Sequence, residues 1–497
     1  MKLFSATQLK QWDAYTIAHE HIKSIDLMER AAAGCFNWII ENNFRDRTFK
    51  IFCGNGNNGG DGLALARMLI HNNCRVYVYI SGSAVSASND FTINLERLRS
   101  LTPVHNIESG NEFAALENSD VIIEALFGTG LNRPPGGLVK EIIEHINKSK
   151  STVISLDVPG GLFADMSSVE NTVIRARYTL TFQRLKLALL MPENQEFFGE
   201  ITVINIGLDK TFEENENTFY ELSDHKKIKK IYKPRNAFSH KGNFGHACLL
   251  AGSYGMMGAA TMAAKACLRS GAGKLTCITC RQGYEIMQVA VPEAMCIVSG
   301  NKHIENWEDL TLYDSVGVGP GLGLYPSNKP WLTKLLKKYS GPFMLDADAL
   351  TLISENKKLL ALIPRHSIIT PHPKEFERLF GKTKNNFEML KLAIKKSLEH
   401  GIYIVLKGHH TIIATPDKMT YFNNTGNAGM ATGGSGDVLT GIITGLLAQG
   451  YSPCNACLLG VYIHGAAGDI AANKFSKEAM IAGDIIECLG EAFREVS

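Results

Sequence analysis

The stretch Gly426-Asn427-Ala428-Gly429-Met430-Ala431-Thr432-Gly433-Gly434-Ser435-Gly436-Asp437 decides the fold of the C-terminal half. Five glycines in eleven residues precede a run whose apolar residues recur on one helix face. These apolar residues are Val438, Leu439, Ile442, Ile443, Leu446 and Leu447. A glycine-rich turn that opens onto a helix presents unpaired backbone N–H groups at the positive end of the helix dipole. Such a turn binds phosphate or another developing anion.

Asp437 lies where its carboxylate enters the same anion site. A carboxylate there repels phosphate, so it is unfavourable if the turn only holds a phosphate group. It suits a base that takes a proton from a hydroxyl, which then attacks a phosphoryl group. The alternative is that Asp437 only caps the helix.

The composition indicates a soluble globular protein. A chain of 497 residues exceeds one ordinary core, so two or three domains are expected. Its net charge of +2 argues against nucleic acid or an anionic membrane as the main partner. The N-terminal segment is polar, and no run reaches the roughly 18 apolar residues of a membrane span. We therefore expect a cytoplasmic protein, and one that forms a homo-oligomer.

The 11 cysteines are scattered along a large chain, which favours reduced thiols. Two C-x-x-C pairs occur, Cys277/Cys280 and Cys454/Cys457. The first lies in an apolar segment typical of a strand, where residues i and i+3 face opposite sides. Thiols of the protein core are therefore predicted at these positions, and neither a zinc site nor a redox pair.

Apolar strands alternate with amphipathic helices along most of the chain, which predicts largely parallel α/β sheets. Residues 210–235 interrupt this alternation with a charged, apolar-poor stretch. We expect a first domain at 1–215, a linker at 216–234 and a second domain at 235–497. The strands are predicted near 49–53, 76–80, 121–125, 153–158, 177–183, 201–206, 247–251, 275–280, 315–318, 343–346, 368–370, 402–406 and 411–414.

Three strand ends in the first half carry polar loops. Gly54-x-Gly56-x-x-Gly59 follows a strand, but the next strand does not end in the acidic residue of a standard dinucleotide site, which disfavours an NAD-dependent dehydrogenase. The loop offers Asn57, Asn58 and Asp61 instead. Glu124 precedes a second loop and Asp157 begins the third. Since open α/β sheets bind ligands at the carboxyl ends of their strands, one site is expected there.

These motifs resemble the NAD(P)H-hydrate epimerase family over residues 5–210. The resemblance implies a Rossmann-like three-layer sandwich that interconverts the R and S hydrates of damaged NADH and NADPH. It implies Asp157 as the acid/base residue and a potassium site at Asn58, Glu124 and Gly160. It also implies substrate contacts from Asn57, Asn58, Gly59, Gly60, Asp61, Gly128, Thr129, Gly130, Leu131, Asn132, Arg133, Pro134 and Asp157.

Two positions depart from the pattern of that family, and both belong to the potassium site. Glu124 stands where the family has Asp, which lengthens a ligand by one methylene. Gly160 stands where the family has Ser, which removes a hydroxyl. These departures argue against a complete potassium site. They also keep open a second possibility, that the first domain is a nucleotide sensor without activity.

The second half also ends several strands in polar or glycine-rich loops. They are Gly252 to Ala259, Gly317 to Gly323, Asp346 to Leu350, Thr370 to Glu375 and Lys407 to Thr411. Taken singly, His372 is typical of a loop histidine with satisfied hydrogen bonds, and one of Asp346 and Asp348 of a helix cap. Together with the loop at 433–437, they predict a second site at one edge of a sheet.

This half resembles the ribokinase-like fold and, within it, the ADP-dependent NAD(P)H-hydrate dehydratase family over residues 235–495. The resemblance implies hydrate contacts from Ala259, Gly323, His372 and Asp437. It implies nucleotide contacts from Lys407, Gly408, His409, His410, Thr411 and Gly436. The order of the two halves is that of the bifunctional members of the family.

The implied chemistry uses ADP and Mg²⁺. Asp437 deprotonates the ring hydroxyl of the hydrate (NADHX or NADPHX), and the hydroxyl attacks the β-phosphoryl group of ADP. Phosphate then leaves, and reduced cofactor, AMP and phosphate are the products. The alternative is a ribokinase-type kinase of a small hydroxylated metabolite, because the same loop serves a phosphoryl acceptor there.

Overall fold

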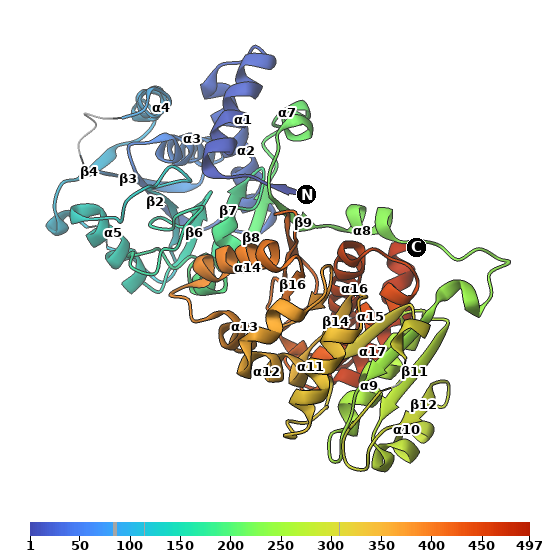
Figure 1. The fold of residues 1–497 in the computed structure, drawn as a ribbon. Coiled ribbons are helices and arrows are strands. Elements are labelled where there is room, and N and C mark those ends of the chain that lie inside the picture. The colour runs from blue at the N-terminus through green and yellow to red at the C-terminus, as the bar shows by residue number, and fades with distance from the viewer. Residues whose placement is uncertain (83–86, 114, 308) are drawn as a thin grey trace. The chain divides into compact units, whose positions relative to one another are not determined.

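The structure is a computed structural model that describes residues 1–82, 87–113, 115–307 and 309–497. The chain forms two compact units (Figure 1). One contains residues 2–218 with 385–387, and the other contains residues 1, 219–384 and 388–497. The helices in the described ranges are all too short or too polar to cross a membrane. The predicted α/β class is confirmed for both units.

The N-terminal unit is built on a parallel sheet. Its strands run in the order β4-β3-β2-β5-β6-β7-β8, and each strand pairs in parallel with its neighbours. They are β2 (Thr48–Cys53), β3 (Arg75–Ser81), β4 (Val104–Ile107), β5 (Val121–Ala125), β6 (Thr152–Leu156), β7 (Tyr178–Phe182) and β8 (Glu200–Ile204); β1 (Lys2–Leu3) precedes them.

Helices cover both faces of this sheet and make three layers. Phe49, Ile51 and Cys53 of β2 pack into the cluster that contains helices α1 to α4, whereas Phe52 packs with α5 on the other face. This alternation is the period of two that a strand imposes on its side chains. The helices are α1 (Ala6–His19), α2 (Ser24–Glu41), α3 (Asn57–His71), α4 (Asn89–Arg99), α5 (Gly137–Lys148), α6 (Gln195–Phe198) and α7 (Lys210–Asn215).

Helix α3 begins at Asn57, earlier than the glycine-rich loop suggested. Glycine has a low helix propensity, but here glycines are needed because the first turn lies against backbone. A Cβ at Gly59 would lie 1.7 Å from the carbonyl oxygen of Gly54. Asn57, Asn58 and Asp61 therefore project from the first turns of a helix and not from a loop.

The C-terminal unit has a mixed sheet in the order β9-β18-β17-β16-β15-β14-β13-β10-β11-β12. Strands from β16 to β12 in this order are parallel, while β17 is antiparallel to both its neighbours. The strands are β9 (Tyr220–Ser223), β10 (His246–Leu250), β11 (Lys274–Thr279), β12 (Met295–Val298), β13 (Ser315–Val318), β14 (Phe343–Leu345), β15 (Ile368–Ile369), β16 (Tyr403–Leu406), β17 (Ile412–Ala414) and β18 (Thr420–Asn423).

Side chains on both faces of this sheet are buried. Leu249 packs with α9, and its neighbours Cys248 and Leu250 are also fully buried. The helices are α8 (His225–Ile231), α9 (Met257–Arg269), α10 (Tyr284–Ala290), α11 (Asn328–Lys338), α12 (Ala347–Glu355), α13 (Pro373–Phe380), α14 (Asn386–His400), α15 (Ser435–Ala448), α16 (Pro453–Phe475) and α17 (Ala482–Val496).

The stretch predicted as a linker carries two of these elements. Strand β9 pairs in parallel with β18, and Ile228 of α8 is fully buried in the core. The limits 1–215 and 235–497 remain a prediction.

Cys277, Cys280 and Cys457 are buried free thiols, and Cys454 is half-buried and free.

Helix α15 packs closely against α9 through glycines. A Cβ at Gly441 would lie 2.1 Å from the carbonyl oxygen of Ala263, and one at Gly445 would lie 2.6 Å from that of Cys267. Backbone cannot move aside as a flexible side chain can, so these two positions fix the distance between the helices. They thereby fix where the N-terminus of α15 ends up, with Asp437 on its first turn.

We expect Gly441→Ala to destabilise the protein by ~1–3 kcal/mol, because overpacking against backbone outweighs the better helix propensity of alanine. Gly490→Ala in α17 is the matched control, since a Cβ there meets nothing within 4 Å. That substitution should stabilise by about 0.5–1 kcal/mol. Urea unfolding of both variants measures the difference, and equal effects of the two would contradict the packing argument.

Candidate functional site

In the N-terminal unit, the polar loops meet at the point where the strand order reverses. Strand β2 lies between β3 and β5, so the chain leaves it toward one side of the sheet and later returns on the other. Such a switch point opens a crevice at the carboxyl ends of the strands. The loops after β2, β5, β6 and β7 end there, as the sequence predicted for the first three.

Asp157 forms an ion pair with a lysine that the sequence motifs did not identify. Lys186 Nζ lies 2.5 Å from Asp157 Oδ1, and its side chain is only 2% exposed. Lys186 also donates to Thr181 Oγ1 and to the carbonyl of Phe182. Asp157 has a φ of 67°, a left-handed conformation that is uncommon for a residue with a side chain. Strain of this kind concentrates at functional sites, where the surrounding structure maintains it.

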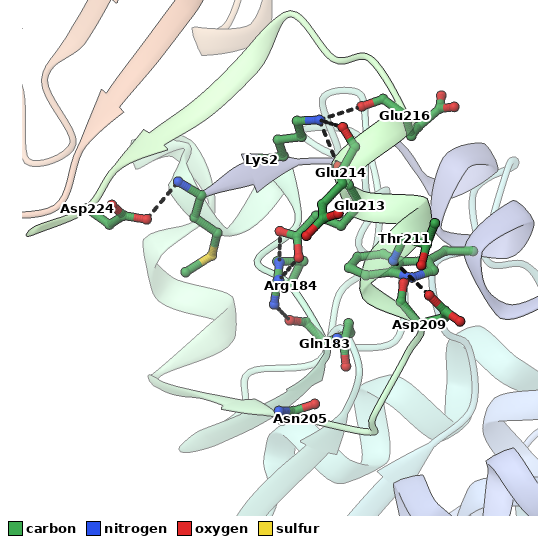
Figure 2. A network of polar contacts seen from close by, with 12 residues as sticks. Lys2, Gln183, Arg184, Asn205, Asp209, Thr211, Glu213, Glu214, Glu216 and Asp224 are labelled. Atoms are coloured by element: carbon green, nitrogen blue, oxygen red, sulfur yellow. Dashed lines mark hydrogen bonds and ion pairs between the residues drawn. The ribbon is translucent and has the colours of Figure 1, made fainter. Parts of the chain in front are cut away.

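The loop that carries Lys186 is anchored to helices α1 and α7. Arg184 makes a two-pronged ion pair with Glu213 of α7, with N–O distances of 3.1 and 2.5 Å, and its guanidinium lies over the ring of Trp12 in α1. Figure 2 shows Lys2 capping the C-terminal end of α7: its ammonium donates to the carbonyls of residues 213, 214 and 216. A bidentate ion pair restricts geometry as well as adding binding energy. The Arg184–Glu213 pair therefore anchors the loop that places Lys186 beside Asp157.

Two of the predicted substrate loops contact this pair. Thr129 N donates to Asp157 Oδ2 at 3.2 Å, and a Cβ at Gly128 would lie 3.2 Å from the same oxygen. Asn58 donates to the carbonyl of Leu156, and its Oδ1 is buried without a partner. Further along the second loop, the predicted residues lie outward: Gly130, Asn132, Arg133 and Pro134 are exposed, and Leu131 is half-buried.

Glu124 is fully buried and surrounded by donors. Its carboxylate accepts from Leu126 N at 2.8 Å, Ser155 Oγ at 2.7 Å and Gly160 N at 2.9 Å. The backbone N–H of Phe127 also donates to it. Burial raises the pKa of Glu124 to about 7, although these hydrogen bonds favour the charged form.

A cavity of about 250 Å³ opens beside this site. Asp13 of α1 and Asn57 and Asp61 of α3 line it, together with apolar residues of α2. Burial, with a contribution from Asp157, raises the pKa of Asp13 to about 7 and that of Asp61 well above its usual range. Asp13 and Asp61, two carboxyl groups with raised pKa values, therefore line one cavity near Asp157. Such an arrangement is suited to acid/base chemistry.

In the C-terminal unit, the strand order reverses between β10 and β13. Away from this reversal, Lys407, just after β16, is the centre of a group of polar contacts at the carboxyl ends of β14 and β16. Its Nζ lies 2.9 Å from Asp346 Oδ1 and 3.8 Å from Glu375 Oε2. The other oxygen of Asp346 accepts from Thr440 Oγ1 of α15 at 2.8 Å. These contacts join the ends of β14 and β16 to the first turns of α15.

The glycine turn lies beside this lysine. Gly434 precedes α15 with a φ of 94°, and a Cβ at Gly436 would lie 3.4 Å from Lys407 Nζ. Burial raises the pKa of Asp437 to about 7; Asp346 adds to the rise and Lys407 opposes it. Burial lowers the pKa of Lys407, but Asp346, Glu375 and Asp437 raise it more, so the lysine stays charged. A helix N-terminus, a charged lysine and a carboxyl group with a raised pKa thus lie close together.

The other predicted residues border this group to different extents. Asp348 Oδ2 accepts from Gly323 N at 2.8 Å, and a Cβ at Gly321 would lie 3.2 Å from that of Ala259. His372 caps helix α13 by accepting from the backbone of Lys374 and Glu375, as a loop histidine does.

The turn after Lys407 is largely solvent-facing. Gly408 and His409 are exposed, and His410 Nδ1 lies 3.0 Å from the carbonyl of Asn423. Thr411 closes the turn by donating to the Gly408 carbonyl at 3.0 Å. Of the five predicted nucleotide residues at 407–411, Lys407 is therefore the one that contacts the carboxylates of Asp346 and Glu375.

Sequence reasoning missed four residues of these sites: Asp13, Ser155, Lys186 and Thr440. Ser155 and Lys186 lie at or just after strand ends, so the rule that identified Asp157 could have identified them. Thr440 lies three residues beyond Asp437, within one helical turn of it. Asp13 lies on a helix far away in the sequence, and no local pattern connects it to the site.

Comparison with known proteins identifies both halves. The model of the family described as NAD(P)H-hydrate dehydratase matches residues 247–490, and that of the family described as YjeF-related protein N-terminus matches residues 24–188. The bifunctional NAD(P)H-hydrate repair enzyme of Moorella thermoacetica is 35% identical over 100% of this chain and 97% of that protein. The enzyme of the same name from Escherichia coli is 34% identical over 93% and 88%.

A solved structure resembles the C-terminal half. It is the ADP/ATP-dependent NAD(P)H-hydrate dehydratase of Bacillus subtilis, co-crystallized with ATP and Mg²⁺. It is 32% identical, with a TM-score of 0.50, and the match covers 56% of this chain and 99% of that chain.

The raised pKa of Asp437 predicts that this residue costs stability above neutral pH. The folded state holds its proton up to about pH 7, whereas the unfolded chain releases it near 3.8, so the penalty develops between these values and persists above them. We expect Asp437→Asn to increase the free energy of unfolding at pH 8 by about 1 kcal/mol or more, and to have no such effect at pH 4. Calorimetry at both pH values tests this, with the exposed Asp46→Asn as control. Equal effects at both pH values would contradict it.

Proposed function

The chain belongs to the family of bifunctional NAD(P)H-hydrate repair enzymes, and we propose how its two sites divide this repair. The N-terminal unit interconverts the R and S hydrates of NADH and NADPH at Asp157. The C-terminal unit dehydrates the S form at Asp437, using ADP. The observation that carries the proposal is the half-buried Asp437 carboxyl at a helix N-terminus, with its pKa raised to about 7, near the Lys407–Asp346 ion pair where strand ends converge.

Dehydration needs a better leaving group than hydroxide. Asp437, with its raised pKa, takes the proton of the ring hydroxyl, and the hydroxyl oxygen attacks the β-phosphorus of ADP as AMP leaves. The phosphate then leaves the ring carbon, a proton is lost from the neighbouring carbon, and the double bond of the reduced nicotinamide is restored. N–H groups of the glycine turn and the Lys407 ammonium stabilise the negative charge that develops on phosphorus.

The nucleotide lies on the same side of the site, held by residues 407–411 and Gly436. Lys407 and the Gly436 backbone support this placement, because they lie side by side at the positive end of α15. Mg²⁺, present with ATP in the Bacillus structure, would neutralise charge on the phosphates. Among the described residues no three His, Cys, Asp or Glu side chains cluster as a metal site, so the ion would enter on the nucleotide. Ala259, Gly323 and His372 face the hydrate.

Epimerisation inverts a carbon that bears a hydroxyl group. One group must give a proton to the departing oxygen, and another must take a proton from the oxygen that returns. Asp157 transfers one of these protons and is held in place by Lys186 and by Thr129 N. Asn58 Oδ1 is free to accept a hydrogen bond from the substrate hydroxyl. Asp13 and Asp61, whose pKa values are raised by burial, line the adjoining cavity and supply the second proton-transfer group.

The deciding experiment follows recovery of the reduced-nicotinamide absorbance from a mixture of R and S hydrates with ADP and Mg²⁺. Full recovery is expected if both units are active. Recovery that stops near the S fraction would show an active dehydratase with an inactive N-terminal unit. A stable phosphorylated product without recovery, seen by mass spectrometry, would instead favour a kinase.

We also propose that the protein is a cytoplasmic homo-oligomer. Light scattering would measure the size of this oligomer.

Asp437→Asn should lower dehydratase turnover by ~10²–10⁴-fold, since an amide cannot take the hydroxyl proton. Nucleotide binding should persist, because the asparagine keeps the volume and removes a charge that repels phosphate. Turnover with pure S hydrate and calorimetric titration with ADP measure the two effects. Turnover near that of the unchanged enzyme would rule out Asp437 as the base.

Asp157→Asn should abolish R/S exchange but leave dehydration of the S hydrate unchanged, because the two residues belong to different compact units. Chromatographic separation of the two hydrates without ADP measures exchange directly. If exchange continues in this variant faster than the spontaneous rate, another residue is the acid/base group.

A further inference from the structure

The potassium site implied by family resemblance does not fit the residues present. It would use oxygens of Asn58, of the residue at 124 and of the residue at 160. A carboxylate has about four lone-pair sites. In Glu124 they accept from Leu126 N, Phe127 N, Ser155 Oγ and Gly160 N. Gly160 has no side chain to contribute, so Asn58 Oδ1 is the one side-chain oxygen left.

Glu124 and Gly160 are also linked by volume. A Cβ at position 160 would lie 2.5 Å from Glu124 Oε1 and 3.1 Å from its Cδ. The carboxylate cannot swing away cheaply, because it is fully buried and held by four donors. The longer acid therefore occupies the place that a side chain at position 160 would need, so Glu124 is compatible with the site only while residue 160 is glycine.

The donors to Glu124 come from the segments that form the site. Leu126 and Phe127 lead into the loop with Gly128 and Thr129, which contact Asp157. Ser155 and Gly160 flank Asp157 on the other side. One carboxyl group thus ties both substrate loops together, the task that a cation bound by their oxygens could perform.

We propose that the Glu124 carboxyl replaces a bound potassium ion in this chain, and that Glu124 and Gly160 form one coupled pair that makes the N-terminal site independent of potassium. Glu124 is a positioning residue, because it acts through the loops and not on the reacting atoms. Asn58 Oδ1 is then left for a hydroxyl of the substrate. The activity part of this inference rests on the proposed epimerase function, but the structural part does not.

The first test compares the full chain in KCl and in tetramethylammonium chloride at equal ionic strength. Hydrogen–deuterium exchange of peptides covering 121–132 and 154–165 should be the same in both salts, because the amides at 126, 127 and 160 are bonded to Glu124 in either. The R/S exchange rate, measured without ADP, should agree within about twofold. Slower deuterium uptake in potassium alone would overturn the proposal. If neither salt supports R/S exchange, the epimerase function fails while deuterium uptake still decides the cation question.

The second test separates the pair. Gly160→Ser alone should lower the R/S exchange rate at least tenfold, because its Cβ meets the pinned carboxylate. The double variant Glu124→Asp/Gly160→Ser should recover much of that loss and should become dependent on potassium in both rate and deuterium uptake. Gly136→Ser is the matched control, since a Cβ at Gly136 meets nothing within 4 Å, and its rate should not change.

Two outcomes of the second test would overturn the coupling. One is a Gly160→Ser variant as active as the unchanged protein, and the other is a double variant less active than Gly160→Ser alone. If Gly160→Ser does not fold, the comparison of salts on the unchanged chain still decides whether potassium binds.

Discussion

A nearly buried lysine–aspartate contact lies at the centre of each half of this protein. Lys186 pairs with Asp157 in the N-terminal unit, and Lys407 pairs with Asp346 in the C-terminal unit. Removing two charges from water is costly, and apolar residues of similar size often stabilise a protein more. Both pairs lie at the carboxyl ends of parallel strands, after β6 and β7 in the first unit and after β14 and β16 in the second. Their position argues that they are retained for the reactions at these edges and not for stability.

Each pair has further carboxyl groups around it, and this crowding sets their protonation. Asp13 and Asp61 share the region of Asp157, and Asp437 shares that of Asp346. One lysine cannot neutralise several buried acids, so the pKa values of the others rise toward or beyond neutrality. A carboxyl group such as that of Asp437, whose pKa is raised to about 7, can both accept a proton and release it near neutral pH. The same burial lowers the stability of the folded state, so the sites exchange stability for reactivity.

The parallel sheets and the convergence of strand-end motifs could be predicted from the sequence, because apolar periodicity and glycine-rich turns are local signals. Short strands carry little of this signal: β12 and β18 lie outside the predicted strands, although β15 was predicted near 368–370. Asp13 could not be predicted as a site residue, because it approaches Asp157 only in the folded unit, where α1 packs against α2 and α7. The start of α3 at Asn57 could not be predicted, because glycine disfavours helices. In the structure, the close contact between Gly59 and the Gly54 carbonyl leaves room only for glycine in this first turn.

The departures at Glu124 and Gly160 illustrate what spacing alone leaves out. In the sequence they are two separate losses, a longer ligand and a missing hydroxyl. In the structure they meet in one volume, because the carboxylate occupies the space beside the glycine and accepts its N–H. A close-packed interior makes such changes interdependent, since neither residue can be altered without leaving a clash or unpaired donors. Two substitutions that each look harmful can therefore together preserve a site, with a covalently attached carboxyl group in the place of a bound ion.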